Sequence, residues 1–217
     1  MTDFDRARKV MVDNQLRTSG ITDRRLLAAM GEVPRELFVP ESRRELAYID
    51  EALPVSETRK LGAPAPFAKL VQLAEIGHAD HVLDLGCSTG YSAAVLGQLA
   101  ASVVAVEPDA SLAAVAREAL AKSGAGNVTV VEGELETGGK GRGPYDVIVI
   151  EGAVESVPDA LLSLLKPDGR LVALLASPGR VAVAHLFARS GKSIASRAAF
   201  DAKLPPLTVK QDENFVF

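Results

Sequence analysis

A glycine-containing loop with acidic neighbours is the segment of this chain best suited to chemistry. It reads Val82-Leu-Asp-Leu-Gly86-Cys-Ser-Thr-Gly90-Tyr91 and joins a short apolar run to a helical pattern. Gly86 and Gly90 permit tight turning and a close approach of the backbone to a ligand, and the helix start offers unpaired N–H donors. An open α/β sheet places its ligand at the carboxyl end of a strand. The loop is therefore predicted to bind a polar ligand.

Two carboxylates indicate the kind of ligand. Asp84 lies two positions before Gly86, and Glu107 ends the next apolar run. An acid at the end of the second strand can accept both hydroxyls of an adenosine ribose, and Asp84 would favour a cation. The spacing is acid-x-G-x-x-x-G rather than the G-x-G-x-x-G of dinucleotide sites, so S-adenosylmethionine is favoured and a nicotinamide cofactor is the weaker alternative. The structural alternative is a helix-capping Asp84 and a plain strand-to-helix turn.

No side chain is predicted to act as a general acid, base or nucleophile. Cys87 has no paired base and is expected to be a small packed side chain. His78, His81 and His185 fall away from the functional end of the sheet, and no metal-ligand spacing is present.

Apolar runs alternate with helical patterns after residue 66. The runs at 81–85, 102–106, 128–131, 145–150 and 170–175 are unbroken by polar residues, with helices expected at 91–99, 111–121 and about 158–165. This alternation predicts a Rossmann-like, doubly wound α/β sheet that is mostly parallel. The last two runs, 180–188 and 193–200, are too close for a crossover helix, which indicates an antiparallel C-terminal hairpin.

The N-terminal third has a different pattern. Two short helices are expected between residues 5 and 30, the second capped by Thr22 or Asp23. Prolines at 34, 40, 54 and 64 then indicate an irregular but ordered segment that covers something. We predict a helical extension and covering segment at 1–66 and an S-adenosylmethionine-binding domain at 67–217.

Charge and composition exclude several classes of protein. The 217 residues contain 24 Lys and Arg against 28 Asp and Glu, a net charge of −4, which argues against a dedicated nucleic-acid-binding protein. A single cysteine permits no internal disulfide. The polar start and the lack of a long apolar run predict a cytoplasmic protein without a signal peptide or membrane span.

From about Met11 to Leu207 the chain resembles the protein-L-isoaspartate O-methyltransferases, which repair damaged proteins. The resemblance implies an acceptor carboxylate on a protein or peptide and cofactor contacts through Gly86, Cys87, Ser88, Gly90 and Glu107. It also places Gly133 and Glu134 where the family has Gly-Asp-Gly near the adenine. The matching motifs include Gln15-Leu16, Gly20-Ile-Thr-Asp23, Val33-Pro-Arg-Glu-Leu-Phe-Val-Pro40, Ala47-Tyr-Ile-Asp50, Gly86 to Tyr91, Pro144-Tyr-Asp146 and Gly169-Arg-Leu-Val172.

The chain departs from the family at two places. Ser88 stands for the middle glycine of the loop, and Lys60, Leu61 and Gly62 replace the Thr-Ile-Ser of a Gln-Thr-Ile-Ser-Gln-Pro run that encloses cofactor and acceptor. We expect Lys60, Leu61 and Gly62 to contact the acceptor, and we hypothesise that Arg59 and Lys60 bind an acidic one. Three functions stay open: an isoaspartyl methyltransferase, a methyltransferase with another acceptor, and a non-catalytic S-adenosylmethionine-binding protein.

Overall fold

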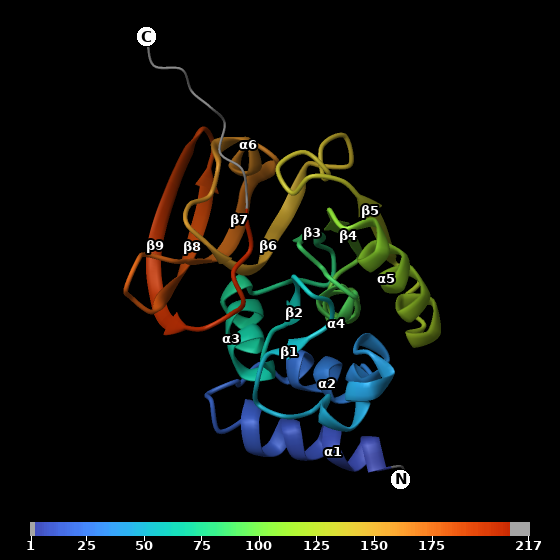
Figure 1. The fold of residues 1–217 in the computed structure, drawn as a ribbon. Helices are drawn as coiled ribbons and strands as arrows, with labels where there is room; N and C mark the ends of the chain where they lie inside the picture. Colours follow the sequence, from blue (N-terminus) through green and yellow to red (C-terminus); the bar gives the residue numbers. More distant parts are fainter. Residues whose placement is uncertain (1–2, 209–217) are drawn as a thin grey trace.

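The computed structural model describes residues 3–208, and a seven-stranded sheet forms its centre (Figure 1). The strand order is β5-β4-β3-β6-β7-β8-β9, with parallel pairing from β5 to β7 and antiparallel pairing of β8 and β9. The predicted α/β sheet and its C-terminal hairpin are therefore confirmed. The strands are β3 (His81–Leu85), β4 (Ser102–Glu107), β5 (Val128–Glu132), β6 (Tyr145–Val154), β7 (Leu165–Leu175), β8 (Ala182–Ser190) and β9 (Ser193–Ala202).

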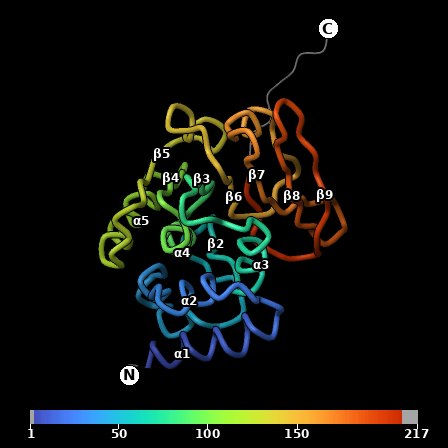
Figure 2. Tube along the Cα trace, turned by 180° about the vertical axis from the view of Figure 1, so that it is seen from behind, coloured from blue at the N-terminus to red at the C-terminus, as the bar shows by residue number. Residues whose placement is uncertain are grey.

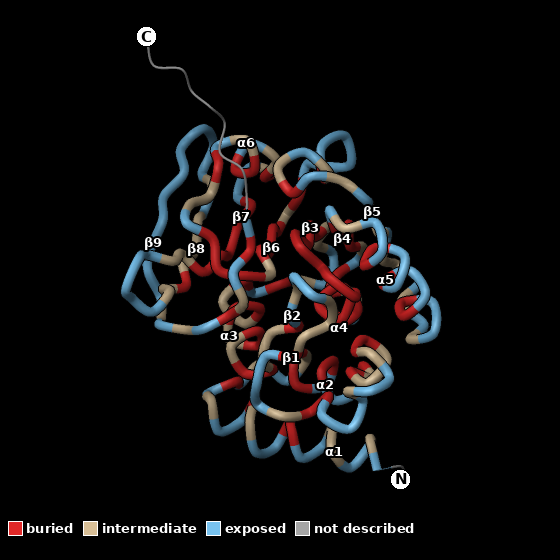
Figure 3. Tube along the Cα trace, in the orientation of Figure 1, coloured by how far each residue is buried: buried red, intermediate tan, exposed pale blue. Residues whose placement is uncertain are grey.

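Both faces of the central strands are buried, which is why these runs are continuously apolar. Val82 and Val103 point into one core, and Leu83 and Val104 point into the other. The first face is covered by α3 (Pro64–Ala74), α4 (Tyr91–Leu99) and α5 (Ala110–Ser123). Figure 3 shows this buried centre and the exposed β9 edge.

The second face has a thinner cover than the sequence predicted. The expected helix at 158–165 is only the single turn α6 (Asp159–Leu162), and Leu165 already belongs to β7. Pairing with β6 explains the difference, because the Tyr145 N–H donates to the Leu164 carbonyl at 2.9 Å and Leu165 pairs with Tyr145, and Pro167 cannot continue a helix beyond them. The loop after β5 completes this face.

The N-terminal third packs against the sheet domain and shares its core. Met11, Leu26 and Phe38 belong to the same buried cluster as Val82, and Figure 2 shows the N-terminal helices beside α3 and α4. Asp23 caps the second helix by accepting two backbone N–H groups, which confirms one of the two predicted caps. The elements are α1 (Asp3–Met11), a π-helical turn (Val12–Leu16), α2 (Arg24–Glu32), 3-10 turns (Arg35–Phe38 and Glu41–Leu46), β1 (Leu53–Pro54) and β2 (Lys60–Leu61). No helix within residues 3–208 is long and apolar enough to cross a bilayer.

A fully buried arginine joins the covering segment to α4. The Nε of Arg35 donates to the Ala47 carbonyl at 2.7 Å, and its Nη2 donates to the Gly62 carbonyl at 2.7 Å. The guanidinium also lies 4.6 Å from the centre of the Tyr91 ring. A single guanidinium thus connects the segments at Ala47, Gly62 and Tyr91. Burial disfavours its charged form and lowers the pKa of Arg35.

Replacing Arg35 by methionine should destabilise the fold strongly. Two buried carbonyls lose charged donors, so we expect the free energy of unfolding in urea to fall by about 3 kcal/mol. Arg44→Met, at an exposed arginine of the same segment, should change it by less than about 0.5 kcal/mol. Equal unfolding midpoints for Arg35→Met and the unmutated protein would contradict this role.

Candidate functional site

The loop after β3 lies at the point where the sheet reverses its winding. The chain proceeds from β3 to β4 and β5 on one side and returns to place β6 on the other side of β3. Such a switch point opens a crevice at the carboxyl ends of the strands. Gly86, Ser88 and Gly90 all have positive φ, at 82°, 53° and 95°, so the loop curls tightly before α4 begins. Ser88 occupies a conformation that non-glycine residues rarely adopt.

Glu107, at the end of β4, is the acid that the loop encloses. Its side chain is fully buried. Its Oε2 accepts the Ser88 N–H at 2.7 Å, and its Oε1 accepts the Asp109 N–H at 3.2 Å. The structure therefore brings together the predicted loop and the predicted ribose-binding acid. Gly133 adjoins them, because its N–H donates to the Glu107 carbonyl at 3.2 Å, and Glu134 follows it at the same edge.

Asp84 is buried beneath the loop. Its Oδ2 accepts the Ser92 hydroxyl at 2.7 Å, while its Oδ1 has no partner within residues 3–208. Burial raises the pKa of Asp84 to about 7, against the opposing effect of the Ser92 hydrogen bond. The Ser88 hydroxyl is likewise buried without a partner in the described chain. These two unpaired polar atoms can form hydrogen bonds with a bound polar ligand.

Glu151 is a third acid of this site and is not among the residues predicted from the sequence. It follows Ile150, which pairs with Leu85 across β6 and β3, so Glu151 lies beside Gly86 at the sheet edge. Its Oε1 is buried and unpaired within the described residues, and burial with the nearby Asp84 carboxyl raises the pKa of Glu151 well above its ordinary value. An acid ending an apolar run is the signal that identified Glu107, and it would have identified Glu151.

Cys87 and His81, which the sequence analysis considered for chemistry, lie in surroundings that indicate structural roles. Cys87 is buried, and burial raises the pKa of its thiol well above the ordinary value. The His81 ring lies 2.7 Å from the Ser102 hydroxyl and stacks on Tyr145. Among residues 3–208, no three His, Cys, Asp or Glu side chains gather as a metal site would require.

Arg59 enters the site from the covering segment. Its Nη1 donates to Glu107 Oε1 at 2.8 Å, and its Nη2 donates to the Gly86 carbonyl at 2.8 Å. Arg59 is thus paired with the chain's own acid rather than presented to an acceptor. Of the three predicted acceptor contacts, Leu61 is buried in the core, and the Gly62 carbonyl accepts a hydrogen bond from Arg35. Only Lys60 is exposed.

The C-terminal segment crosses the same edge of the sheet. The Ala153 N–H donates to the Pro205 carbonyl and the Leu207 N–H donates to the Ala153 carbonyl, both at 2.9 Å. Leu207 packs on two glycines, because a Cβ added to Gly86 would lie 2.7 Å from Leu207 Cδ2 and one added to Gly152 would lie 2.6 Å from Leu207 Cβ. Only glycine leaves room for this side chain.

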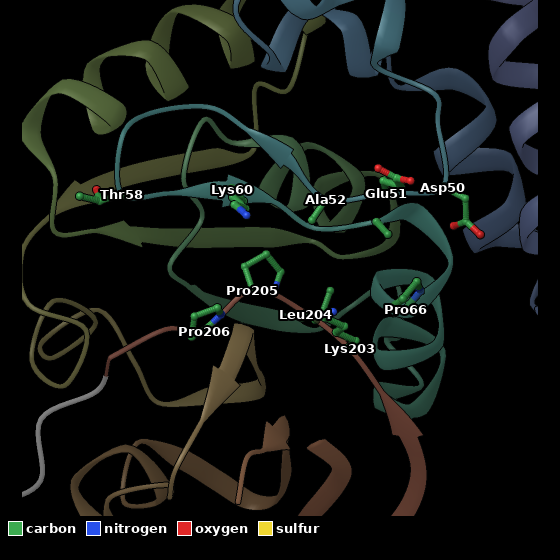
Figure 4. A pocket seen from close by; sticks show the side chains of 11 residues that line it. Asp50, Glu51, Ala52, Thr58, Lys60, Pro66, Lys203, Leu204, Pro205 and Pro206 are labelled. Atoms are coloured by element: carbon green, nitrogen blue, oxygen red, sulfur yellow. The ribbon is translucent and has the colours of Figure 1, made fainter. Parts of the chain in front are cut away.

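A cavity of about 690 Å³ lies between the covering segment and this C-terminal segment (Figure 4). Lys60 and Lys203 contribute cations to its lining, and Asp50 and Glu51 contribute acids. In Figure 4 Lys60 lies opposite Pro205, with Asp50 and Glu51 at one end. The lining includes neither Glu107 nor the loop at 86–90, so the cavity is adjacent to the acid cluster rather than part of it.

The residues present suit S-adenosylmethionine, but the conformation does not leave room for it. Glu107, the loop amides and the unpaired acids match the hydroxyls and cations of that molecule. The space against Gly86 and Glu107 is taken by Arg59 and Leu207. The donor set therefore fits the cofactor, and the Arg59 and Leu207 side chains occupy the position that it would take.

The Asp84 carboxyl should make stability depend on pH. The folded protein keeps this proton up to about pH 7, whereas an unfolded aspartate releases it near pH ~4, so the free energy of unfolding should fall as the pH rises through this range. Asp84→Asn keeps an acceptor for Ser92 and removes the titration. In urea unfolding between pH 5 and 8, the free energy of unfolding of the variant should rise relative to that of the unmutated protein by up to roughly 1 kcal/mol per pH unit. Parallel profiles would contradict the assigned pKa.

Comparison with known proteins identifies the family. The family model described as protein-L-isoaspartate (D-aspartate) O-methyltransferase matches residues 6–211. The protein-L-isoaspartate O-methyltransferase of Methanoculleus marisnigri is 42% identical over 168 residues, covering 77% of this chain and 76% of its own, and that of Koribacter versatilis is 42% identical over 175 residues, covering 81% and 78%. A Plasmodium falciparum structure described under the same activity, in complex with S-adenosyl-L-homocysteine, shares the fold at a TM-score of 0.79 and 20% identity, covering 92% of this chain and 97% of its own. This chain belongs to the protein-L-isoaspartate O-methyltransferase family.

Proposed function

We propose that this protein is an S-adenosylmethionine-dependent carboxyl O-methyltransferase that acts on isoaspartyl residues of damaged proteins. The observation that carries the proposal is the enclosure of Glu107 by the loop after β3, with the Ser88 N–H 2.7 Å from its Oε2. The acid and the loop meet at the switch point of the sheet, where this fold binds its ligand. The names of the relatives support the activity, and the S-adenosyl-L-homocysteine in the Plasmodium falciparum structure supports the cofactor.

Each residue of the site has a task in this proposal. Glu107 holds the ribose hydroxyls, and the amides of the loop at 86–90 approach the rest of the cofactor. Gly133 and Glu134 border the adenine, and the positive charges of the cofactor favour the ionised forms of Asp84 and Glu151 beside it. The cofactor supplies a methyl group on a sulfonium. The chain aligns the acceptor carboxylate and excludes water, since an ionised carboxylate needs no base.

The cavity beside the covering segment is the proposed acceptor site. Its volume of about 690 Å³ admits a short stretch of polypeptide, and the Lys60 ammonium can pair with the acceptor carboxylate. Lys60 replaces a hydroxyl of the family motif, and this replacement is the specific reason to keep a methyltransferase with another acidic acceptor as the second candidate. We also propose, from the sequence, that residues 1–66 form a cover and residues 67–217 the cofactor-binding part. We further propose that the protein is cytoplasmic.

Transfer of labelled methyl groups tests the activity. Purified protein with labelled S-adenosylmethionine should esterify an isoaspartyl hexapeptide and leave the matched aspartyl hexapeptide unlabelled. Labelling of a different acidic acceptor alone would favour the second candidate. Affinity for S-adenosylhomocysteine without transfer to any acceptor would identify a non-catalytic binding protein, and a lack of affinity for either nucleotide would overturn the proposal.

Lys60→Ala should weaken binding of the acceptor and leave binding of the cofactor unchanged. Loss of one charged hydrogen bond is worth a factor of about ten, so the acceptor KM should rise about tenfold with little change in kcat or in the dissociation constant of S-adenosylhomocysteine. Lys122→Ala, at an exposed lysine of α5, serves as the matched control. An unchanged KM would remove Lys60 from the acceptor site.

A further inference from the structure

The position beside Glu107 and Gly86 is filled by the chain itself. Arg59 reaches the two groups that a nucleoside would use here, the Glu107 carboxylate and the Gly86 backbone, at 2.8 Å each. Leu207 covers the remaining face of Gly86. Glu107 is consequently fully buried, and neither of its carboxylate oxygens is exposed to a ligand. Two segments far apart in the sequence therefore close one site.

We propose that Arg59 and Leu207 form a latch that occupies the cofactor site and must withdraw before the cofactor binds. This inference rests on the proposed function, since it assigns a competitor to the same site. Arg59 acts in it as a stand-in cation among three acids, Asp84, Glu107 and Glu151. The positive charge of S-adenosylmethionine takes over this compensation when Arg59 leaves.

The segment that carries Arg59 can move without disturbing the sheet. It sits in a hairpin whose strands are two residues each, pairing Leu53 with Leu61 and Pro54 with Lys60. Such a short hairpin has little stability of its own. The turn holds itself together, since the Val55 N–H donates to the Arg59 carbonyl at 3.0 Å and the Arg59 N–H donates to the Ser56 hydroxyl at 3.0 Å.

The backbone around Leu207 makes few hydrogen bonds, although the Leu207 side chain belongs to the buried cluster that includes Leu83 and Leu85. Its segment is attached to the end of β6 by the two backbone hydrogen bonds at Ala153, and Gly152 offers no side chain to lock it. Withdrawal of the turn that carries Arg59 and of the segment that carries Leu207 exposes Gly86 and Glu107. The contacts of Arg35 keep the remainder of the covering segment in place. A latch of this kind lowers the apparent affinity for the cofactor by the fraction of molecules that are open.

Calorimetric titration with S-adenosylhomocysteine tests the latch. Arg59→Ala and Leu207→Ala should each bind about tenfold more tightly than the unmutated protein, because each removes a competitor. Arg197→Ala, at an exposed arginine on the outer strand β9, should bind as the unmutated protein does. Arg59→Gln, which removes the charge but keeps polar character, guards against misfolding of the alanine variant and should also bind more tightly.

The outcomes separate the latch from the proposed function. Equal affinities in all proteins would overturn the latch and leave the proposed function standing. A lack of binding by every variant, including those without the latch, would overturn both. Weaker binding by Arg59→Ala and Arg59→Gln, with both folded, would show that Arg59 supports the cofactor rather than competes with it, and would also overturn the latch.

Trypsin gives a second readout that needs no activity. In a Lys60→Gln background, Arg59 is the only tryptic site between Arg44 and Lys69. Its guanidinium is engaged in the closed site, so cleavage after Arg59 should be slow in the free protein and about fivefold faster with saturating S-adenosylhomocysteine. Cleavage after the exposed Arg44 provides the internal reference. Unchanged or slower cleavage after Arg59 in a protein that binds the nucleotide would overturn the latch.

Discussion

The burial of the Glu107 carboxylate is the constraint around which this edge of the molecule is organised. A carboxylate removed from water must be compensated by hydrogen bonds or charge. Two backbone N–H groups, from Ser88 and Asp109, and the Arg59 guanidinium provide that compensation. Each donor comes from a different segment, so a single acid determines where the loop, the end of β4 and the covering segment meet.

The surrounding charges explain why the site resembles a ligand site and yet is closed. Asp84, which is buried, and Glu151, whose Oε1 is buried, add two further acids on neighbouring strands, and removal from water raises the pKa of both. Arg59 compensates this cluster only in part, and atoms of both acids remain without a partner in the described chain. The site therefore combines the acid-rich composition that suits a cationic nucleoside with an internal cation already bound. The acids come from β3, β4 and β6, whereas the β1–β2 hairpin carries Arg59 into the site and Lys60 to the adjacent cavity.

The agreement between sequence and structure is greatest where the pattern is local. Unbroken apolar runs predicted the parallel strands β3 and β4, the four-residue spacing predicted the β8–β9 hairpin, and Asp23 was one of two predicted caps. The expected helix at 158–165 is only one turn, because Leu164 and Leu165 hydrogen-bond and pair with the start of β6, a tertiary contact that the apolar pattern does not record. Glu151 was overlooked although it ends an apolar run as Glu107 does.

By itself, the sequence determined the fold class, the loop after the first strand, the acid at the end of the second and the family resemblance. These depend on residue order over short distances, which periodicity and glycine spacing record directly. Only the tertiary structure decided that Arg59 and Leu207, 148 positions apart in the numbering, meet over Gly86. No local pattern encodes such a meeting, because it depends on how the cover folds over the sheet and on two glycines that leave room for one leucine.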